Sequence, residues 1–326
     1  MKGALILDKC SQPPYEVRDG IAYFLGTNIQ YQHVNHLGGL YAPPFMNFPY
    51  VFDEGYLLKL DDFHSIKHLP NLDLDVIILS LEKVDYSIKD IRKKYPNAKI
   101  IGALKEFNPV GGWGNKPGHL ERVVRIFKEV DVPTMPYSKK ERFFEFEKII
   151  GRELVHLRDP IDVDYLYNNY YGEKENVALC YVAPTHRDRG QRETFAFCNF
   201  IEKEFGVKIL YHPFTQPYDH SKRMPFPEFI NYINRSSFCV NFDKWYGVGQ
   251  CGLHCASLGT IHIGGTSDSN LELFPETSVN DPKKLKNVFE DLYFNMDNRV
   301  NYIQKVFQQI NSKYSLSVIK QRIKEL

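Results

Sequence analysis

The chain has 326 residues, longer than the ~100–200 residues of one common domain, and this length favours two domains. Hydrophobic residues make up 43% of the chain, a globular composition that excludes an intrinsically disordered protein. The 41 Lys and Arg residues balance the 40 Asp and Glu residues, so the net charge of +1 gives no general attraction to nucleic acid or anionic membrane.

No apolar run approaches the ~20 residues that a membrane span needs, and the N-terminal apolar run is too short for a signal peptide. We therefore expect a soluble protein of the cytoplasm. The six cysteines are scattered and lie mostly in apolar segments, which is typical of reduced core cysteine. Cys251 and Cys255 flank His254 at a spacing that is unusual for zinc, so we expect no metal there.

In the first half, residues 3–8 form a short apolar run that predicts a buried strand. Residues 21–52 are rich in aromatic residues, glycine and proline, and their secondary structure is not evident from the pattern. Strands and helices then alternate, as is typical of a parallel sheet. The predicted strands are 76–81, 99–104 and 132–135, and the predicted helices are 88–95 and 119–129.

Residues 143–164, which include Arg-Asp-Pro-Ile-Asp at 158–162, are expected to be the exit from a first domain. A second series of elements follows. The predicted strands are 176–182, 207–211, 238–242 and 260–263, and the predicted helices are 191–205, 226–233, 253–258, 283–294 and 300–326. A glycine-rich turn (Gly247, Gly249 and Gly252) precedes the helix at 253–258, and a loop containing Glu272 follows the strand at 260–263. A turn and helix start at the carboxyl end of a sheet favour a phosphate group, so this segment indicates a nucleotide site.

The order of features from residue 238 to 281 resembles the nucleotide-sugar segment of GT-B fold glycosyltransferases, especially glycosyltransferase family 4 (group 1). The matching pieces are residues 246–249, residues 258–263, the Gly264-Gly265 pair and Glu272-Leu273. The resemblance implies an α/β fold with two Rossmann-like domains facing each other across a cleft. It implies an acceptor domain at 1–160, a nucleotide-sugar domain at 161–300, and a last helix at 301–326 that packs back toward the first domain.

The same resemblance implies an enzyme, a hexosyltransferase-like and metal-independent transferase without a separate cofactor. Its donor would be a nucleotide-diphosphate sugar, with UDP as the default nucleotide. Asp-x-Asp pairs at residues 73–75 and 162–164 lack the buried strand that should precede a metal-binding pair of the GT-A type, which supports the metal-independent class.

Donor-site residues follow from the positions that match the family. Arg187 and Arg189 would contact the diphosphate, because a guanidinium group suits a phosphate that gains charge as the sugar leaves. Gly247 and Gly249 would let the backbone approach the sugar and phosphates, with Gln250 beside them. Glu272 would hold the ribose hydroxyls. The alternatives are a solvated charged turn for the arginines and an ordinary acid near a helix start for Glu272.

The catalytic residues are less determined. Retaining members of the family carry two glutamates where this chain has Tyr246 and His254, which leaves the retaining or inverting outcome open. His254 is a candidate to bond a phosphate or sugar hydroxyl, with a structural role as the alternative. Glu106, just after the predicted strand at 99–104, is the candidate general base of an inverting reaction.

The acceptor is expected to be a glycan or a hydroxymethylated DNA base, and DNA would require a local basic patch. The basic residues that could form one are Lys105, Lys116, Arg122, Arg125, Lys139, Lys140 and Arg142. Two other classes compete. The literal G-x-G-x-x-G of residues 247–252 suggests an NAD-dependent oxidoreductase, and the missing glutamates suggest a non-catalytic nucleotide-sugar or glycan-binding protein. The sequence leaves the oligomeric state open.

Overall fold

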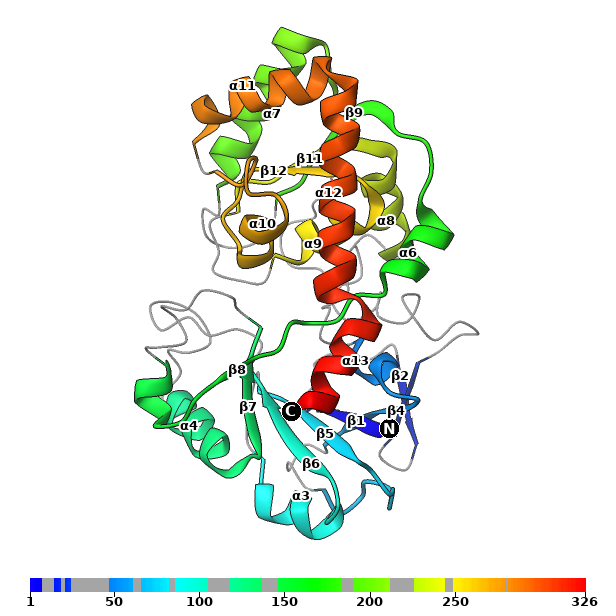
Figure 1. The fold of residues 1–326 in the computed structure, drawn as a ribbon, viewed down its shortest axis with the longest axis vertical. Coiled ribbons are helices and arrows are strands. Elements are labelled where there is room, and N and C mark those ends of the chain that lie inside the picture. Colours follow the sequence, from blue (N-terminus) through cyan, green and yellow to red (C-terminus); the bar gives the residue numbers. More distant parts are fainter. Residues whose placement is uncertain are drawn as a thin grey trace. The chain divides into compact units, whose positions relative to one another are not determined.

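The structure is a computed structural model, and it describes residues 1–7, 15–18, 21–24, 47–60, 66–81, 86–104, 118–136, 146–182, 190–211, 226–243, 249–279 and 281–326. The chain divides into two compact units (Figure 1). The first contains the described residues up to Ile161 together with Leu316–Leu326, and the second contains the described part of Asp162–Ser315. Every helix in these ranges is too short or too polar to cross a lipid bilayer.

The described part of the first unit holds a sheet of eight strands in the order β2, β3, β4, β1, β5, β6, β7, β8. The six neighbouring strands β4, β1, β5, β6, β7 and β8 pair in parallel. Strands β2 and β3 form an antiparallel edge. The bounds are β1 (Lys2–Leu7), β2 (Tyr15–Arg18), β3 (Ile21–Phe24), β4 (Glu54–Lys59), β5 (Val76–Ser80), β6 (Lys99–Ala103), β7 (Val132–Met135) and β8 (Val155–His156).

The central strand β5 is a continuous apolar run that is buried throughout, as expected for a parallel strand covered on both faces. The helices of this unit are α2 (Phe48–Val51), α3 (Ile88–Lys94), α4 (His119–Glu129) and α13 (Leu316–Glu325). Helix α3 begins at Ser87, whose hydroxyl accepts a hydrogen bond from the Asp90 amide at 3.3 Å. Helix α13 packs on α2, burying Ile319 and Ile323.

The second unit contains a four-stranded parallel sheet in the order β10, β9, β11, β12 among its described residues. Its strands are β9 (Glu175–Cys180), β10 (Lys208–Tyr211), β11 (Ser236–Val240) and β12 (Ile261–Ile263). The chain passes from β9 to β10 on one side and then returns to β11 on the other. The strand order therefore reverses between β9 and β11, which is the place where open α/β sheets bind their ligands.

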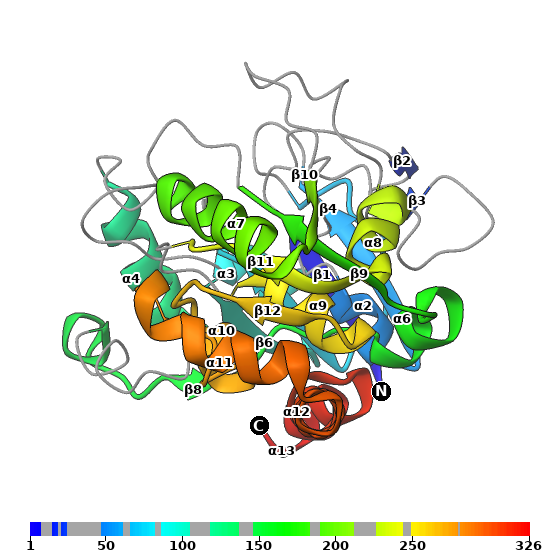
Figure 2. The same ribbon diagram turned by 90° about the horizontal axis from the view of Figure 1, so that it is seen from above.

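Helices cover both faces of this second sheet (Figures 1 and 2). The rings of Phe197 and Phe289 pack together and bring α7 and α11 to the face that carries Phe238. Helices α8 and α9 contact the sheet as well, and α12 packs on α9. The bounds are α6 (Val163–Tyr170), α7 (Gln191–Phe205), α8 (Phe226–Arg235), α9 (Gln250–Leu258), α10 (Asp268–Leu273), α11 (Pro282–Phe294) and α12 (Met296–Tyr314).

Three expected elements differ from the structure. The helix expected at 253–258 begins earlier, as α9, because Gly249 takes φ +82° and starts the helix at Gln250. The expected loop around Glu272 contains the short helix α10. The closing helix expected at 300–326 is two helices, α12 and α13, because Ser315 between them is extended with ψ 153°. The two helices belong to different units, and along the chain the boundary between the first and the second unit lies between Ile161 and Asp162.

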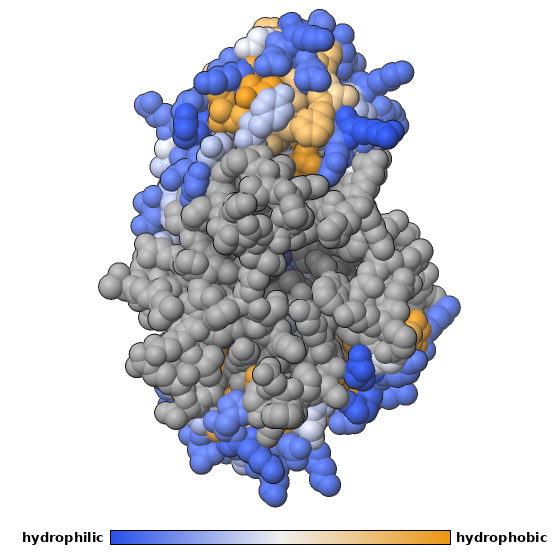
Figure 3. Space-filling view, turned by 180° about the vertical axis from the view of Figure 1, so that it is seen from behind, coloured by the Kyte–Doolittle hydropathy of each residue, from blue (hydrophilic) through white to orange (hydrophobic). Residues whose placement is uncertain are grey.

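The described surface that is visible in Figure 3 is mostly hydrophilic, and apolar colour gathers on the second unit. Exposed aromatic side chains of this unit include Phe195 of α7 and Tyr211 of the edge strand β10, whose ring centroids lie 6.4 Å apart.

Candidate functional site

The candidate site is the carboxyl edge of the second sheet, where β9, β11 and β12 end together because they run in parallel. Asn241, the first residue after β11, forms hydrogen bonds to the ends of the two neighbouring strands. Its side-chain Nδ2 donates to the Tyr181 carbonyl at 2.8 Å, and its backbone amide donates to the Ile263 carbonyl at 2.9 Å. These bonds fix the segments that leave the three strands at the point where the strand order reverses.

Two helices begin at this edge with a glycine. Helix α7 starts after Gly190 (φ +86°) and α9 after Gly249 (φ +82°), and neither glycine offers a side-chain cap. A Cβ atom on Gly190 would lie 2.0 Å from the Phe242 carbonyl oxygen, so only glycine fits beside β11. Helix starts without a side-chain cap present backbone N–H groups and a positive dipole end, which is the arrangement that binds phosphate.

Gly249 is enclosed by the segment that follows β12. A Cβ atom on it would lie 2.0 Å from the Ser267 hydroxyl oxygen, and the Ser269 hydroxyl donates to the Gly249 carbonyl at 3.0 Å. A Cβ atom on Gly252 would likewise lie 1.8 Å from Asn270 Oδ1. The glycines of the turn therefore allow α9 and α10 to approach closely, as the contacts between these helices require.

Polar groups are concentrated in this region. Thirteen of the nineteen buried polar residues in the described chain lie between Ser236 and Ser278. Among their buried oxygen atoms, Ser267 Oγ, Asn270 Oδ1 and Ser278 Oγ make no hydrogen bond within the described residues. Because a buried polar atom is normally hydrogen-bonded, this concentration is typical of a binding site and not of a core.

Gly249 and Gln250 lie at this edge, at the first turn of α9, and are half-buried. Gly247, Arg187, Arg189 and Glu106 lie outside the described residues, so the roles expected for them stay predictions.

His254 is completely buried in α9, with its ring edge-on to Phe229 at a centroid distance of 6.4 Å. Burial lowers its pKa to about 3, so the ring is neutral at neutral pH. A neutral ring supplies no positive charge to a phosphate, and its packing on α8 favours the structural role that the sequence analysis left as the alternative.

Glu272 lies on α10, and both oxygens of its carboxylate face the end of α12. Oε2 accepts a hydrogen bond from the Tyr314 hydroxyl at 2.6 Å, and Oε1 lies 3.0 Å from Lys313 Nζ. Its side chain is 14% exposed. A carboxylate has about four acceptor positions, so these partners leave capacity for a ribose hydroxyl.

The sequence analysis did not identify Asn241, Ser267 or Asn270. The polar run Thr-Ser-Asp-Ser-Asn at residues 266–270 was the available signal, because such a run directly after a buried strand is unusual for a core.

In the first unit, Asp159 was identified only as part of the link between domains. It is 4% exposed and lines a small hollow with Ser80 and Thr134, at the carboxyl ends of β5 and β7. This unit therefore also places polar groups at the carboxyl edge of its sheet.

Comparison with known proteins gives a result at the level of the fold. No family model matches the sequence, and no curated protein matches it. Solved structures do match. An alpha-glucosyltransferase in complex with UDP-glucose and DNA containing an abasic site is similar with a TM-score of 0.61 at 11% identity, over 100% of this chain and 98% of that chain.

Two further matches are an alpha-glucosyltransferase in complex with UDP and DNA containing an HMU base, and HepE from Anabaena in complex with UDP. The first has a TM-score of 0.53 at 11% identity, over 83% of this chain and 84% of that chain. The second has a TM-score of 0.56 at 11% identity, over 100% and 99%. The fold is therefore that of GT-B glycosyltransferases, and the predicted fold class is confirmed.

Proposed function

We propose that the protein transfers a sugar from a nucleotide-diphosphate sugar, with UDP as the nucleotide, to an acceptor hydroxyl. The observation that carries this proposal is the carboxyl edge of the second sheet, where helices α7 and α9 each begin after a glycine and the strand order reverses. Oriented N–H groups at this edge would stabilise the diphosphate as it gains negative charge in the transition state. The UDP and UDP-glucose bound in the similar structures support the same donor class.

In this proposal the charge on the leaving diphosphate is balanced by Arg187 and Arg189, which belong to the segment between β9 and α7. Two arginines and two helix starts would then supply the positive potential that other transferases obtain from a metal ion. We propose a metal-independent donor site on this ground.

An NAD-dependent oxidoreductase is less well supported. The G-x-G-x-x-G match follows β11, the third strand of its unit in chain order, whereas the dinucleotide fingerprint follows the first strand. Its last glycine, Gly252, also has a local explanation, because Asn270 occupies the space of a Cβ atom.

For the acceptor, we propose a hydroxymethylated base in DNA, with a glycan as the alternative. Support comes from the two similar alpha-glucosyltransferase structures, which hold DNA, one of them with an HMU base. In the first unit, Arg122 and Arg125 of the expected basic patch lie on α4, with Arg125 exposed. They would add phosphate contacts that the net charge of +1 does not supply.

The donor test is a thermal-shift series of the full chain with UDP, UDP-glucose, GDP, ADP and NAD, each with and without EDTA. We expect a chelator-insensitive shift with UDP, because a ligand at 100 times its Kd stabilises the folded state by about 2.7 kcal/mol. A shift with NAD alone would overturn the proposal.

The acceptor test measures transfer of radiolabelled glucose from UDP-glucose to duplexes with hydroxymethyluracil or hydroxymethylcytosine, with unmodified DNA as the control. Label on the modified duplexes only is the expected result. Label on oligosaccharides but not on DNA would show that the acceptor is a glycan. Binding of UDP without any transfer or hydrolysis would favour the non-catalytic class.

A further inference from the structure

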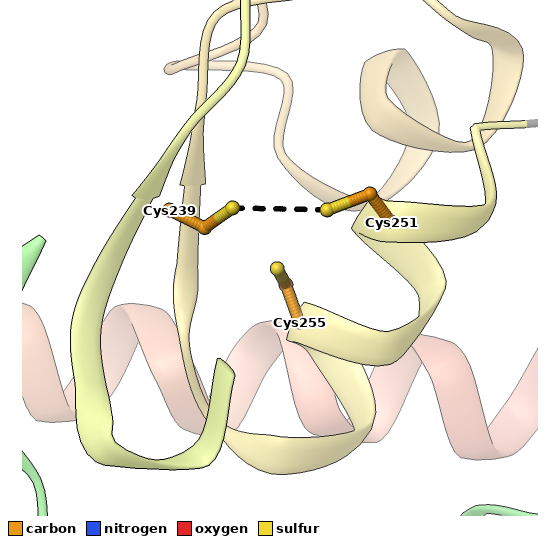
Figure 4. A group of neighbouring side chains, drawn as sticks. All are labelled: Cys239, Cys251 and Cys255. Carbon is orange, nitrogen blue, oxygen red and sulfur yellow. Dashed lines mark hydrogen bonds between the residues drawn. The ribbon is translucent and has the colours of Figure 1, made fainter. Parts of the chain in front are cut away.

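Three cysteine side chains meet in the interior of the second unit. Cys239 comes from β11, and Cys251 and Cys255 come from α9, and their sulfur atoms point toward one another (Figure 4). The three sulfur atoms all lie within 4.8 Å of one another, and those of Cys239 and Cys251 are 3.7 Å apart. All three residues are free cysteines and are at most 7% exposed.

The fold creates this cluster from residues that are distant in the sequence. Cys251 and Cys255 are four residues apart and share one face of α9. Cys239 lies on β11, and the packing of α9 beside β11 and β12 brings its sulfur to the same point. The expectation of no metal considered the spacing of Cys251, His254 and Cys255 only, whereas the cluster contains Cys239 in place of His254.

The distances suit a metal ion. Zinc lies ~2.3 Å from each thiolate sulfur in a tetrahedral site, so two sulfur ligands are about 3.8 Å apart. The Cys239–Cys251 separation of 3.7 Å has this value already. Cys255, within 4.8 Å of both, needs a shift of about 1 Å or less to reach it.

A fourth ligand is available from β12. His262 is the register partner of Cys239 on the neighbouring parallel strand, so both side chains are on one face of the sheet. His262 is completely buried, and within the described residues neither of its ring nitrogens makes a hydrogen bond. Its ring nitrogens lie outside the group of ligand atoms that are within 4.8 Å of one another, so His262 would have to move toward the three sulfur atoms to bind the same ion.

We propose that Cys239, Cys251 and Cys255 bind one thiophilic metal ion, Zn²⁺, with His262 as the fourth ligand. Three thiolates and an imidazole form a known kind of structural zinc site. Because all four side chains are buried, the site has no open position for a substrate water, and its role is structural. On binding, each thiol loses its proton to solvent, so the ion and its ligands carry one negative charge. The half-buried side chain of Lys174, which interacts electrostatically with Cys255, is placed to balance that charge when its amine is protonated.

Such an ion would fix α9 to β11 and β12, directly beneath the first turn of α9 at the candidate donor site. The proposal is independent of the transfer reaction, because its readout is the bound metal.

The test measures the zinc content of the full-length reduced protein by mass spectrometry after dialysis against EDTA. We expect about one zinc per chain, as for a closed structural site. After removal of zinc, Co²⁺ should give an intense thiolate-to-cobalt charge-transfer band and the visible absorption of a tetrahedral site. Zinc should be lost in Cys239→Ser and Cys251→Ser. It should be retained in Cys198→Ser, a matched control, because Cys198 is equally buried but lies on α7.

His262→Ala tests the fourth ligand, and we expect the visible cobalt bands to shift while the charge-transfer band remains. Three results would overturn the proposal: wild-type protein with neither zinc nor a cobalt–thiolate band, equal loss of metal in Cys198→Ser, or a disulfide between Cys239 and Cys251 in protein purified without a reductant. The first and third use the wild-type chain alone, so they hold even where a cysteine variant does not fold.

Discussion

Gly249 combines two requirements that no other residue type meets. Its φ of +82° lies in the left-handed region, and the Ser267 hydroxyl occupies the place of its missing Cβ. The consequence is a close approach of α10 to the first turn of α9, where the donor phosphates are proposed to bind.

We expect Gly249→Ala to weaken UDP binding by at least about tenfold, or about 1.4 kcal/mol, because Ser267 must move away from the first turn of α9. The matched control is Gly206→Ala. Gly206 also has a positive φ, +68°, but no atom of the described residues lies within 4 Å of the place that a Cβ would take, so this change adds only backbone strain, about 1–2 kcal/mol. Calorimetric titration with UDP compares the two variants, and equal affinities would contradict the assignment.

Lys174 should make the stability of the folded protein depend on pH. Its Nζ donates to the Asn234 carbonyl at 2.6 Å and to the Thr260 hydroxyl at 3.0 Å, and burial lowers its pKa to about 7. In the unfolded chain the amine keeps its proton up to a pKa of about 10.4. Between these values the unfolded state binds the extra proton, so stability rises with pH from about 7 to about 10.

We therefore expect the free energy of unfolding of the metal-free protein to gain from Lys174 up to about 1.4 kcal/mol per pH unit above pH 7. In Lys174→Met this contribution is absent. Urea unfolding at several pH values from 6 to 9 measures the difference, with the exposed Lys208→Met as the control. Identical pH profiles for wild type and Lys174→Met would show that the amine is not buried in this way.

Helix α10 illustrates how an element links the site to the rest of the second unit. It carries Ser269 toward Gly249 on one side and Glu272 toward Tyr314 of α12 on the other. Tyr314 is 2% exposed, and its hydroxyl donates a hydrogen bond to Glu272. A change in Glu272 therefore affects both the stability of α12 and the proposed ribose contact.

The two effects can be separated. Tyr314→Phe should lower the free energy of unfolding by about 1.5–3 kcal/mol, because one hydrogen bond to a carboxylate is lost, and should leave UDP affinity within about threefold. Glu272→Gln should weaken UDP binding by about tenfold if the carboxylate holds the ribose. Titration and urea unfolding of both variants give the answer. If the two variants bound UDP with equal affinity, Glu272 would stabilise α12 and would not contact the ribose.

Some elements could be predicted well because their local sequence agrees with their environment. Strand β5 and strand β11 are buried apolar runs, and both were predicted within two residues. Helix α6 was not predicted, because its sequence is polar and aromatic in place of a regular apolar stripe. Its start, Asp162 accepting from the Tyr165 amide at 3.0 Å, is evident only in the structure.

The candidate site also contains features that the sequence predicts and features that only the packing of distant segments creates. The glycine turn and the acid after β12 follow a local order that a sequence can reveal. The position of Ser267 and Asn270 against Gly249 and Gly252 depends on the packing of α10 on α9. Likewise, Cys239 joins Cys251 and Cys255 through a strand and a helix, so no spacing rule applies to it.

At the scale of the whole molecule, the division into two units determines which sheet a substitution in a given helix destabilises. Helix α13 belongs to the first unit, although α12, directly before it, belongs to the second. Ile319 and Ile323 of α13 are each 2% exposed, and Lys320 pairs with Asp53. The stability of the first unit thus depends on the last residues of the described chain.

We expect Ile319→Ala to destabilise the first unit by about 2–5 kcal/mol, because a buried side chain leaves a cavity. Hydrogen exchange should then rise in β1, β5 and β6 and remain unchanged in β9 and β11. Lys324→Ala, on the exposed face of the same helix, is the control. Equal loss of protection in both sheets would contradict the assignment of α13 to the first unit.

The assignment of α13 also has a consequence for biosynthesis. Along the chain, the second unit is an insertion between two parts of the first, because Asp162–Ser315 is flanked by Ile161 and Leu316. A ribosome therefore finishes all of the second unit before it makes the helix that covers α2. During translation the second sheet is able to form while the first still exposes the apolar surface that Ile319 and Ile323 later cover. The order of synthesis thus makes the N-terminal unit the last to be completed.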